Sequence, residues 1–207
     1  MEDHGWTKYY NVDLLDATGP DLEVDIPNGK IIKKNYLGKN IKKYDSMLVL
    51  SHFKGHPMGG YGGALKQLSI GCASSYGKAY IHGAGDPEKL WTADHDKFLE
   101  SMADAASSVV NYFDKKIAYI NVMVNMSVDC DCCAVAEDPC MKDIGILAST
   151  DPVAIDQACV DLVYNSNDPG KDYLIERIES RNGLHTIDSA YELHVGNKEY
   201  ELINIDE

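Results

Sequence analysis

Two segments whose apolar residues do not alternate with polar ones constrain the fold more than any other feature. Residues 46–51 read Ser-Met-Leu-Val-Leu-Ser, and residues 116–124 read Lys-Ile-Ala-Tyr-Ile-Asn-Val-Met-Val. A strand that is apolar at successive positions is typical of a sheet covered on both faces, as in α/β proteins. Residues 144–148 form a third, shorter apolar run. We therefore expect buried strands in these parts of the chain.

Helical patterns separate and follow these strands. Apolar side chains recur at helical spacing over residues 97–113. Asp151 and Pro152 are a favoured N-cap and first helical residue for a helix that runs to about Tyr164. Further helices are expected over residues 64–73, 172–181 and 187–193. This alternation predicts a single α/β domain over residues 1–207, with an open, mostly parallel sheet and helices on both faces.

Two short segments have the patterns of peripheral strands. Residues 24–26 and 30–32 flank the turn sequence Pro27-Asn28-Gly29, so they predict a hairpin. Residues 199–205 alternate polar and apolar side chains, which predicts an edge strand.

The charge of the chain excludes some partners. The net charge is -14, and phosphate binding needs a basic face, so we expect no nucleic-acid partner. An anionic membrane surface is disfavoured for the same reason, and no apolar run approaches the roughly 20 residues that span a bilayer. The N-terminal residues lack both the basic and the apolar region of a signal peptide. The sequence therefore predicts a cytoplasmic protein without a membrane partner.

A cluster of cysteines and carboxylates follows the second apolar strand. Four of the six cysteines lie in residues 129–140, at Cys130, Cys132, Cys133 and Cys140. In a reducing compartment such a cluster is more often a metal or redox site than a disulfide framework. The C-x-C-C-x6-C spacing matches neither a zinc ribbon nor a bacterial ferredoxin. A redox-active thiol pair and a structural loop are the alternatives.

Carboxylates beside these cysteines are further candidate ligands. Asp129 and Asp131 could bind a metal as hard ligands or could orient the thiolates. Aspartates in loops also serve as turn caps, so that interpretation stays open. Asp156 is expected on the helix after Pro152, either facing the site or partly solvated.

A glycine-rich segment follows the first apolar strand. His52 and His56 flank Lys54, and Lys66 lies at the start of the next helix. Four glycines lie between His56 and Lys66, at Gly59, Gly60, Gly62 and Gly63. They would let the backbone approach a ligand and point its N–H groups at an anion. The segment matches neither the P-loop nor the dinucleotide fingerprint. A tight turn with locally bonded histidines is the alternative.

The two loops are expected to share one crevice, because ligands of α/β sheets bind beyond the carboxyl ends of strands. The candidate metal ligands are His52, His56, Asp129, Cys130, Asp131, Cys132, Cys133 and Cys140. The candidate ligand-binding residues are Lys54, Gly59, Gly60, Gly62, Gly63, Lys66 and Asp156.

These motifs together resemble the DUF362 family, often described as uncharacterised iron–sulfur centre proteins. The matching segments are residues 51–56, 59–66, 129–132, 143–149 and 151–157, with Gly71, Ser74, Ser75, Gly77 and Lys78. Many members carry a ferredoxin-like insert with two four-cysteine motifs after the position of Lys78, and this chain lacks it. Longer members also have an N-terminal α/β portion before the position of residues 2–6. The resemblance therefore implies a short member, a trimmed form or half of a split protein, and part of the sheet would then come from a partner or a second copy.

The leading hypothesis is a protein of redox metabolism that holds a metal ion or an iron–sulfur cluster. One alternative is an anion-binding or small-molecule-binding module with structural cysteines. Another is a docking subunit of a redox complex, with a redox protein or a second copy as its partner. The sequence identifies no substrate and leaves open whether the protein is an enzyme.

Overall fold

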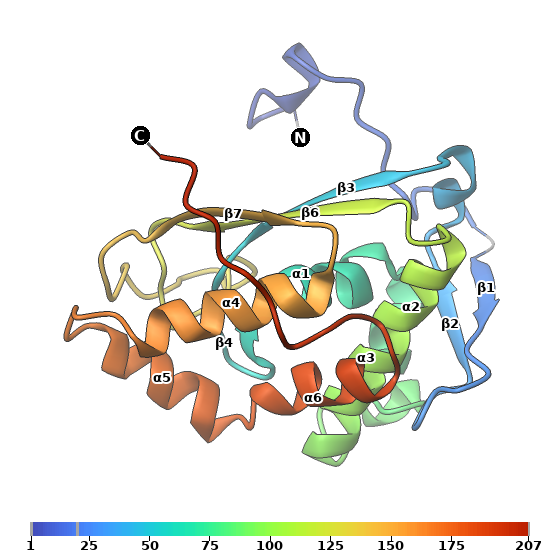
Figure 1. Cartoon of the computed structure of the whole chain (residues 1–207). Coiled ribbons are helices and arrows are strands. Elements are labelled where there is room, and N and C mark those ends of the chain that lie inside the picture. Colours follow the sequence, from blue (N-terminus) through green and yellow to red (C-terminus); the bar gives the residue numbers. More distant parts are fainter. Residues whose placement is uncertain (1, 20, 207) are drawn as a thin grey trace.

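The apolar segments form one three-stranded sheet in the order β3–β6–β7 (Figure 1). The structure is a computed structural model, and it describes residues 2–19 and 21–206. Strand β3 (Met47–His52) runs parallel to β6 (Ile117–Met123), and β7 (Gly145–Ser149) runs antiparallel to β6. The predicted strands in these places are confirmed, and the fold is a mixture of helices and strands.

The arrangement of the sheet differs from the expected open, mostly parallel sheet with helices on both faces. Only one of its two pairings is parallel. Strands β6 and β7 are joined by the long cysteine-containing loop of residues 124–144, without the crossover helix that a parallel pair needs. The helices that pack on the sheet lie on one face, below it in Figure 1. The other face is exposed at Leu48, Leu50 and Ile146.

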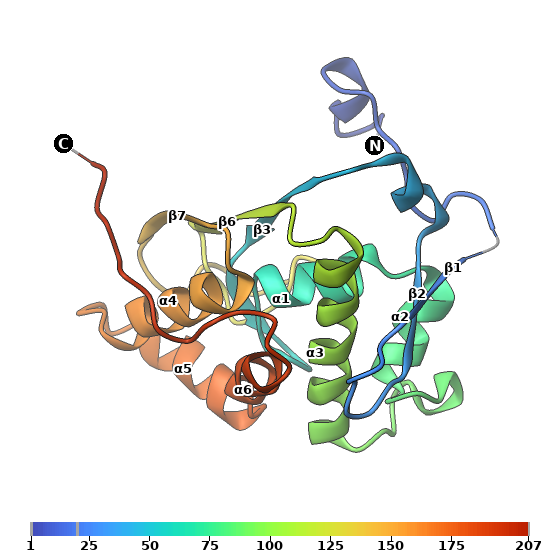
Figure 2. The same ribbon diagram turned by 45° about the vertical axis from the view of Figure 1, so that its right-hand side comes forward.

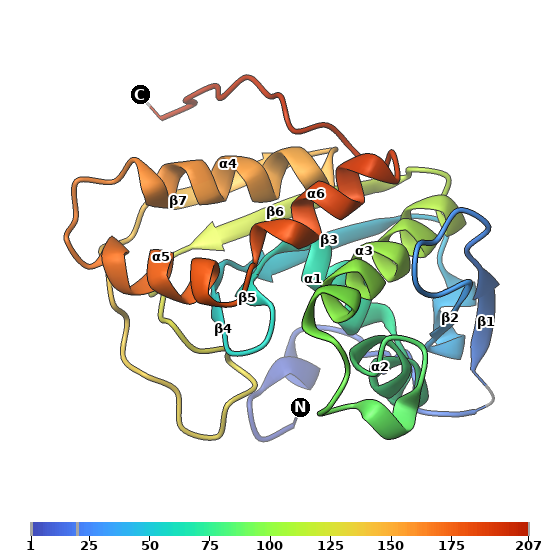
Figure 3. The same cartoon turned by 90° about the horizontal axis from the view of Figure 1, so that it is seen from below.

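The covered face of the sheet forms the main core. Helix α4 (Pro152–Tyr164) runs beneath β6 and β7, α6 (Leu184–Glu192) packs beside α4, and α3 (His95–Tyr112) packs against α6 (Figure 3). Asp151 caps α4, because its Oδ1 accepts hydrogen bonds from Val153 N at 2.9 Å and Ala154 N at 3.0 Å. The predicted cap is therefore confirmed. Helix α5 (Lys171–Ser180) follows α4 and leads into α6.

A separate hairpin stands at one side of the molecule, next to α2 (Ser75–His82) in Figure 2. It pairs β1 (Leu22–Asp25) with β2 (Lys34–Leu37). A hairpin is therefore confirmed here, but its second strand begins later than the predicted residues 30–32, and the connection between the strands is longer than the predicted turn. The buried carboxylate of Asp104 on α3 explains the difference. It accepts backbone hydrogen bonds from Lys30, Ile31 and Ile32, which hold that segment out of the ladder.

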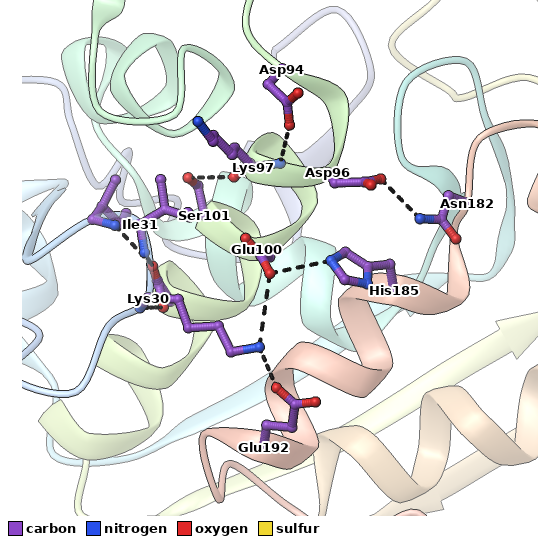
Figure 4. Close-up of polar contacts among 12 residues, drawn as sticks. Lys30, Ile31, Asp94, Asp96, Lys97, Glu100, Ser101, Asn182, His185 and Glu192 are labelled. Atoms are coloured by element: carbon purple, nitrogen blue, oxygen red, sulfur yellow. Dashed lines mark hydrogen bonds and ion pairs between the residues drawn. The ribbon is translucent and has the colours of Figure 1, made fainter.

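Polar contacts fasten the same segment to α3 and α6 (Figure 4). Lys30 forms an ion pair with Glu192, and its Nζ lies 3.8 Å from Glu100 Oε1. His185 Nε2 lies 3.4 Å from the same Glu100 oxygen. This network ties the hairpin connection to the helical layer.

The short elements complete the described chain. They are η1 (Trp6–Lys8), η2 (Lys39–Lys43), α1 (Ala64–Lys66) with the π-turn η3 (Gln67–Gly71), and η4 (Pro87–Lys89). Residues 199–205 lie extended but pair with no strand of the described chain, so the predicted edge strand is wrong. Within residues 2–19 and 21–206, no helix combines the length and the apolar character that a membrane crossing requires.

Candidate thiolate and metal site

The two loops predicted to share a site meet at one edge of the sheet. Because β3 and β6 are parallel neighbours, the segments that follow them leave the sheet side by side. The first forms the buried hairpin β4 (Lys54–His56) and β5 (Gly60–Gly62), and the second is the cysteine loop. Gly55 N donates a hydrogen bond to Ser127 O at 2.8 Å. A Cβ at Gly55 would lie 2.3 Å from Val128 O, so glycine is what permits this contact.

Three potential metal ligands converge where these loops meet. One ligand atom from each of His56, Cys130 and Cys132 lies within 4.8 Å of the other two. Zinc–sulfur bonds are about 2.3 Å long, so the ligand atoms of a tetrahedral site lie somewhat closer together than this. A small contraction would therefore close the three groups around one ion. His56 and Cys130 are buried and Cys132 is exposed, so the open side faces solvent.

The charges around Cys130 favour its thiolate form. Lys66 Nζ lies 3.7 Å from Cys130 Sγ. Burial raises the pKa of the Cys130 thiol, but hydrogen bonds from Cys132 and the charges of Lys66 and Lys54 outweigh it, so the pKa is lowered. Burial and the hydrogen bond to Cys130 raise the pKa of the Cys132 thiol. Of the two thiols, Cys130 is therefore the one that loses its proton more readily, and Cys132 is the one that keeps it.

The backbone fixes the tautomer of His56. Its Nδ1 accepts hydrogen bonds from Met58 N at 3.1 Å and Gly59 N at 2.9 Å. Burial, together with nearby positive charges, lowers the pKa of His56 to about 3, so the ring is neutral. A neutral ring with an accepting Nδ1 carries its proton on Nε2. Among the described residues, Nε2 has no hydrogen-bond partner, so it is the nitrogen free to face a ligand.

Asp131 fastens the cysteine loop to the end of β3. Its carboxylate lies 2.9 Å from Lys54 Nζ and 3.0 Å from His52 Nδ1. The other ring nitrogen of His52 lies 2.8 Å from Val124 O, so both ring nitrogens lie beside oxygen atoms. Burial raises the pKa of Asp131, but the hydrogen bonds from Lys54 and His52 outweigh that effect, so the pKa is lowered overall. In this structure the three residues position the loop.

The other candidate ligands of the loop lie outside the cluster. Cys133 N donates to Cys130 O in a tight turn, and Cys140 Sγ lies 3.4 Å from Met126 O at the base of the loop. Asp129 Oδ1 lies 3.2 Å from Arg177 Nη1 on α5. Among the described residues, the loop therefore contributes two cysteines to the cluster and β4 contributes one histidine, so no four-cysteine shell forms.

Asp156 anchors the glycine-rich segment from beneath. Its fully buried carboxylate accepts hydrogen bonds from Ala64 N and Leu65 N at the start of α1, and from the Asn121 and Tyr61 side chains. Burial raises the pKa of Asp156, against the lowering effect of these four bonds. A Cβ at Gly63 would lie 2.4 Å from Asp156 Oδ1, so this glycine makes the contact possible.

The remaining glycines serve close packing. Gly60 has a φ of +79°, and its Cβ position is 2.8 Å from Gly183 Cα. Gly62 lies under Lys54 and Lys66, whose side chains a Cβ there would meet at 3.7 Å and 3.3 Å. A Cβ at Gly59 would lie 3.6 Å from His56 Nδ1. The segment is thus a packed hairpin that presents two lysines beside the cysteines.

Sequence reasoning missed three residues that shape the site. Arg177 donates to Val128 O at 3.1 Å and pairs with Asp129, while Asn121 and Tyr61 bind Asp156. Asn121 is polar within an apolar strand, which was a usable signal. Arg177 lies on an ordinary amphipathic helix, so its sequence context carried no signal of a role in the site.

Comparison with known proteins agrees with the resemblance drawn from the motifs. A family model described as a domain of unknown function, DUF362, matches residues 1–161. Searches of curated proteins and of solved structures found no match to this chain.

Proposed function

The chain belongs to the DUF362 family, a domain of unknown function, and from its own residues we propose that it binds one soft or borderline metal ion. The ligands are the thiolates of Cys130 and Cys132 and the imidazole of His56. The observation that carries the proposal is the convergence of these three donors within 4.8 Å. Sulfur and imidazole donors suit zinc or ferrous iron better than magnesium or calcium.

The donor count favours a single ion with an open coordination position. A four-cysteine iron–sulfur cluster needs more thiolates than the described cluster offers. Three protein ligands leave one position of a tetrahedral ion for water or substrate, as in catalytic zinc sites. Two thiolates would neutralise a divalent ion, and the nearby Lys66 ammonium adds positive charge. The open position would therefore prefer an anionic ligand such as a carboxylate.

His56 is expected to be the weakest of the three ligands. Histidine ligands usually donate a hydrogen bond through the nitrogen that does not bind the metal. Here that nitrogen accepts two backbone hydrogen bonds and Nε2 carries the ring proton, so binding of an ion at Nε2 would require the proton to move to Nδ1 and both backbone bonds to break. Binding of the ion by the Cys132 thiolate would release the proton of that thiol, so metal affinity should rise with pH.

Elemental analysis of protein purified without oxygen or chelator tests the proposal. We expect about one metal ion per chain in the wild type, and loss of that metal in Cys130→Ser and Cys132→Ser. Cys133→Ser is a matched control in the same loop, because its thiol lies outside the cluster. Metal-free wild-type protein, or unchanged metal in the first two variants, would refute the proposal.

A second candidate function is dithiol–disulfide exchange by the metal-free pair, which is supported by the lowered pKa of Cys130 beside Lys66. The Cys130 thiolate would attack a small-molecule disulfide, form a mixed disulfide and release one thiolate. The Cys132 thiolate, after losing its proton, would displace the second thiolate. The products are a Cys130–Cys132 disulfide and a substrate reduced to two thiols. A Cys132→Ser variant that traps the mixed disulfide would support this function, and one that never does would exclude it.

A further inference from the structure

A cavity of about 370 Å³ lies at the end of the sheet opposite to the cysteine loop. The cysteine loop follows the end of β6, whereas the cavity is lined by Lys115, which precedes β6, and by Thr150 and Asp151, which follow the antiparallel β7. The end of α6 and residues 194–197 close its other side, and Figure 3 shows the end of α6 beside the start of α4. This volume is at the lower end of the range for small-molecule sites.

A buried hydroxyl group faces this cavity without a partner from the protein. Tyr119 on β6 lines the cavity and exposes only 2% of its surface. Among the described residues, none forms a hydrogen bond with its hydroxyl, although a buried tyrosine hydroxyl usually has a partner. Burial and the negative charge of Asp151 raise the pKa of Tyr119, so the hydroxyl keeps its proton and can donate it to a ligand.

The carboxylates beside the cavity are already engaged. Asp151 Oδ1 caps α4, and its Oδ2 accepts hydrogen bonds from Asn197 N at 2.8 Å and Asn197 Nδ2 at 3.2 Å. Glu192 forms the ion pair with Lys30 described above. Neither acidic group is therefore left to attract a cation into the cavity.

The groups that remain around the cavity are donors. Lys115 lines the cavity and forms no ion pair with a described residue, because the neighbouring Asp114 pairs with Lys116 at 3.7 Å. Thr150 and Tyr191 also line it, and within the described parts of the chain their hydroxyls make no hydrogen bond. A cavity surrounded by free donors suits a ligand that supplies acceptors.

We infer that this cavity binds a small organic carboxylate. One carboxylate oxygen would accept a hydrogen bond from the Tyr119 hydroxyl, and the other would face the Lys115 ammonium. Pro152 and Val195 would contact the apolar part of the ligand, with the His194 ring beside them. The chain carries -14, but charges beyond about 10 Å are largely screened at moderate salt, so the local donors decide. The inference does not depend on the proposed metal site.

Titration of the isotope-labelled full chain with benzoate, followed by NMR, tests the inference. Benzylamine is the matched probe, because it carries the opposite charge on a body of similar size. We expect benzoate to bind with a Kd in the millimolar range and to shift the amide signals of Lys115, Thr150 and Gly196. Benzylamine should bind about tenfold more weakly.

Two substitutions test the assigned contacts. Tyr119→Phe removes only the hydroxyl and should weaken benzoate binding about tenfold, because hydrogen bonds to charged groups are strong. Lys115→Met should weaken it about threefold, since Lys115 is exposed. Tyr173→Phe on α5 and Lys97→Met near the start of α3 remove the same groups away from the cavity, so they should bind benzoate as the wild type does. Circular dichroism checks that each variant is folded.

Three results would overturn the inference. Benzoate that fails to bind well above the millimolar range, or binds no better than benzylamine, would show that the cavity does not select a carboxylate. Signal changes confined to Lys54, Lys66 and the cysteine loop would place the carboxylate at the candidate metal site instead. Equal affinity in Tyr119→Phe and the wild type would show that the buried hydroxyl does not contact the ligand.

Discussion

Lys66 Nζ lies 3.7 Å from Cys130 Sγ and joins the glycine-rich segment to the cysteine loop. Lys66 is the last residue of α1, whose start is held by the buried Asp156. Cys130 follows β6, the strand that carries Asn121, another partner of Asp156. One buried carboxylate therefore positions both sides of the contact, and the thiolate chemistry depends on it.

Replacing Lys66 with methionine should slow the alkylation of Cys130. The ammonium favours the thiolate, so its loss should raise the pKa of Cys130 and lower the alkylation rate near neutral pH by up to about tenfold. Mass spectrometry of the Cys130 peptide during iodoacetamide treatment measures the rate. Lys66→Arg keeps the charge and should restore most of the reactivity. Equal rates in wild type and Lys66→Met would contradict the assigned role.

Replacing Asp156 with asparagine should destabilise the fold by about 3 kcal/mol. An amide keeps only one oxygen acceptor and turns an NH2 group toward donors such as Ala64 N or Leu65 N. Urea unfolding of wild type and variant measures the difference. Asp172→Asn, at an exposed position in the first turn of α5, should change stability by less than about 0.5 kcal/mol. A loss below about 1 kcal/mol at Asp156 would refute the anchor role.

Stability of the metal-free protein should fall as the pH drops below 6.5. His56 has a folded pKa of about 3 against an ordinary value of 6.5, so the folded state binds fewer protons than the unfolded state in that window. Its contribution is complete above pH 6.5 and is lost toward pH 3, by up to about 1.4 kcal/mol per pH unit. Unfolding measured between these limits gives the slope. His56→Gln, which cannot titrate there, should show a shallower slope, and equal slopes would contradict the burial of a neutral ring.

Replacing Asp131 with asparagine should weaken metal binding without changing the number of ions bound at saturation. Loss of the contacts to Lys54 and His52 would loosen the loop that carries both cysteines. Changes to residues that orient metal ligands typically cost 10–100-fold in affinity. Competition with a coloured chelator measures the affinity. Asp138→Asn, at an exposed position of the same loop, is the control. Equal affinity in all three proteins would show that Asp131 does not position the ligands.

The sequence predicted most strands and helices because their signals are local. The apolar run at residues 46–51 and the Asp151–Pro152 cap both lie where expected. The same apolar run also predicted helices on both faces, which is wrong for this chain. Apolar residues on a second face indicate that the face needs cover, but they do not say which molecule supplies it. The antiparallel direction of β7 was missed because strand direction depends on the path of a long loop.

The candidate site was predicted as a region rather than as a set of contacts. His56, Cys130 and Cys132 come together because β3 and β6 are parallel neighbours, which the order of elements indicated. The positions of Cys133 and Cys140 depend on irregular turns, for which the sequence carries no periodic signal. The burial of Asp156 depends on contacts with segments far away in the sequence.

X-ray absorption spectroscopy of the metal-loaded protein tests the central claim most directly. If zinc is bound, we expect two sulfur ligands at about 2.3 Å and nitrogen or oxygen ligands at about 2.0 Å, with one sulfur lost in Cys132→Ser. A shell of four sulfurs, or a shell with none, would contradict the assignment of Cys130, Cys132 and His56 as the metal ligands.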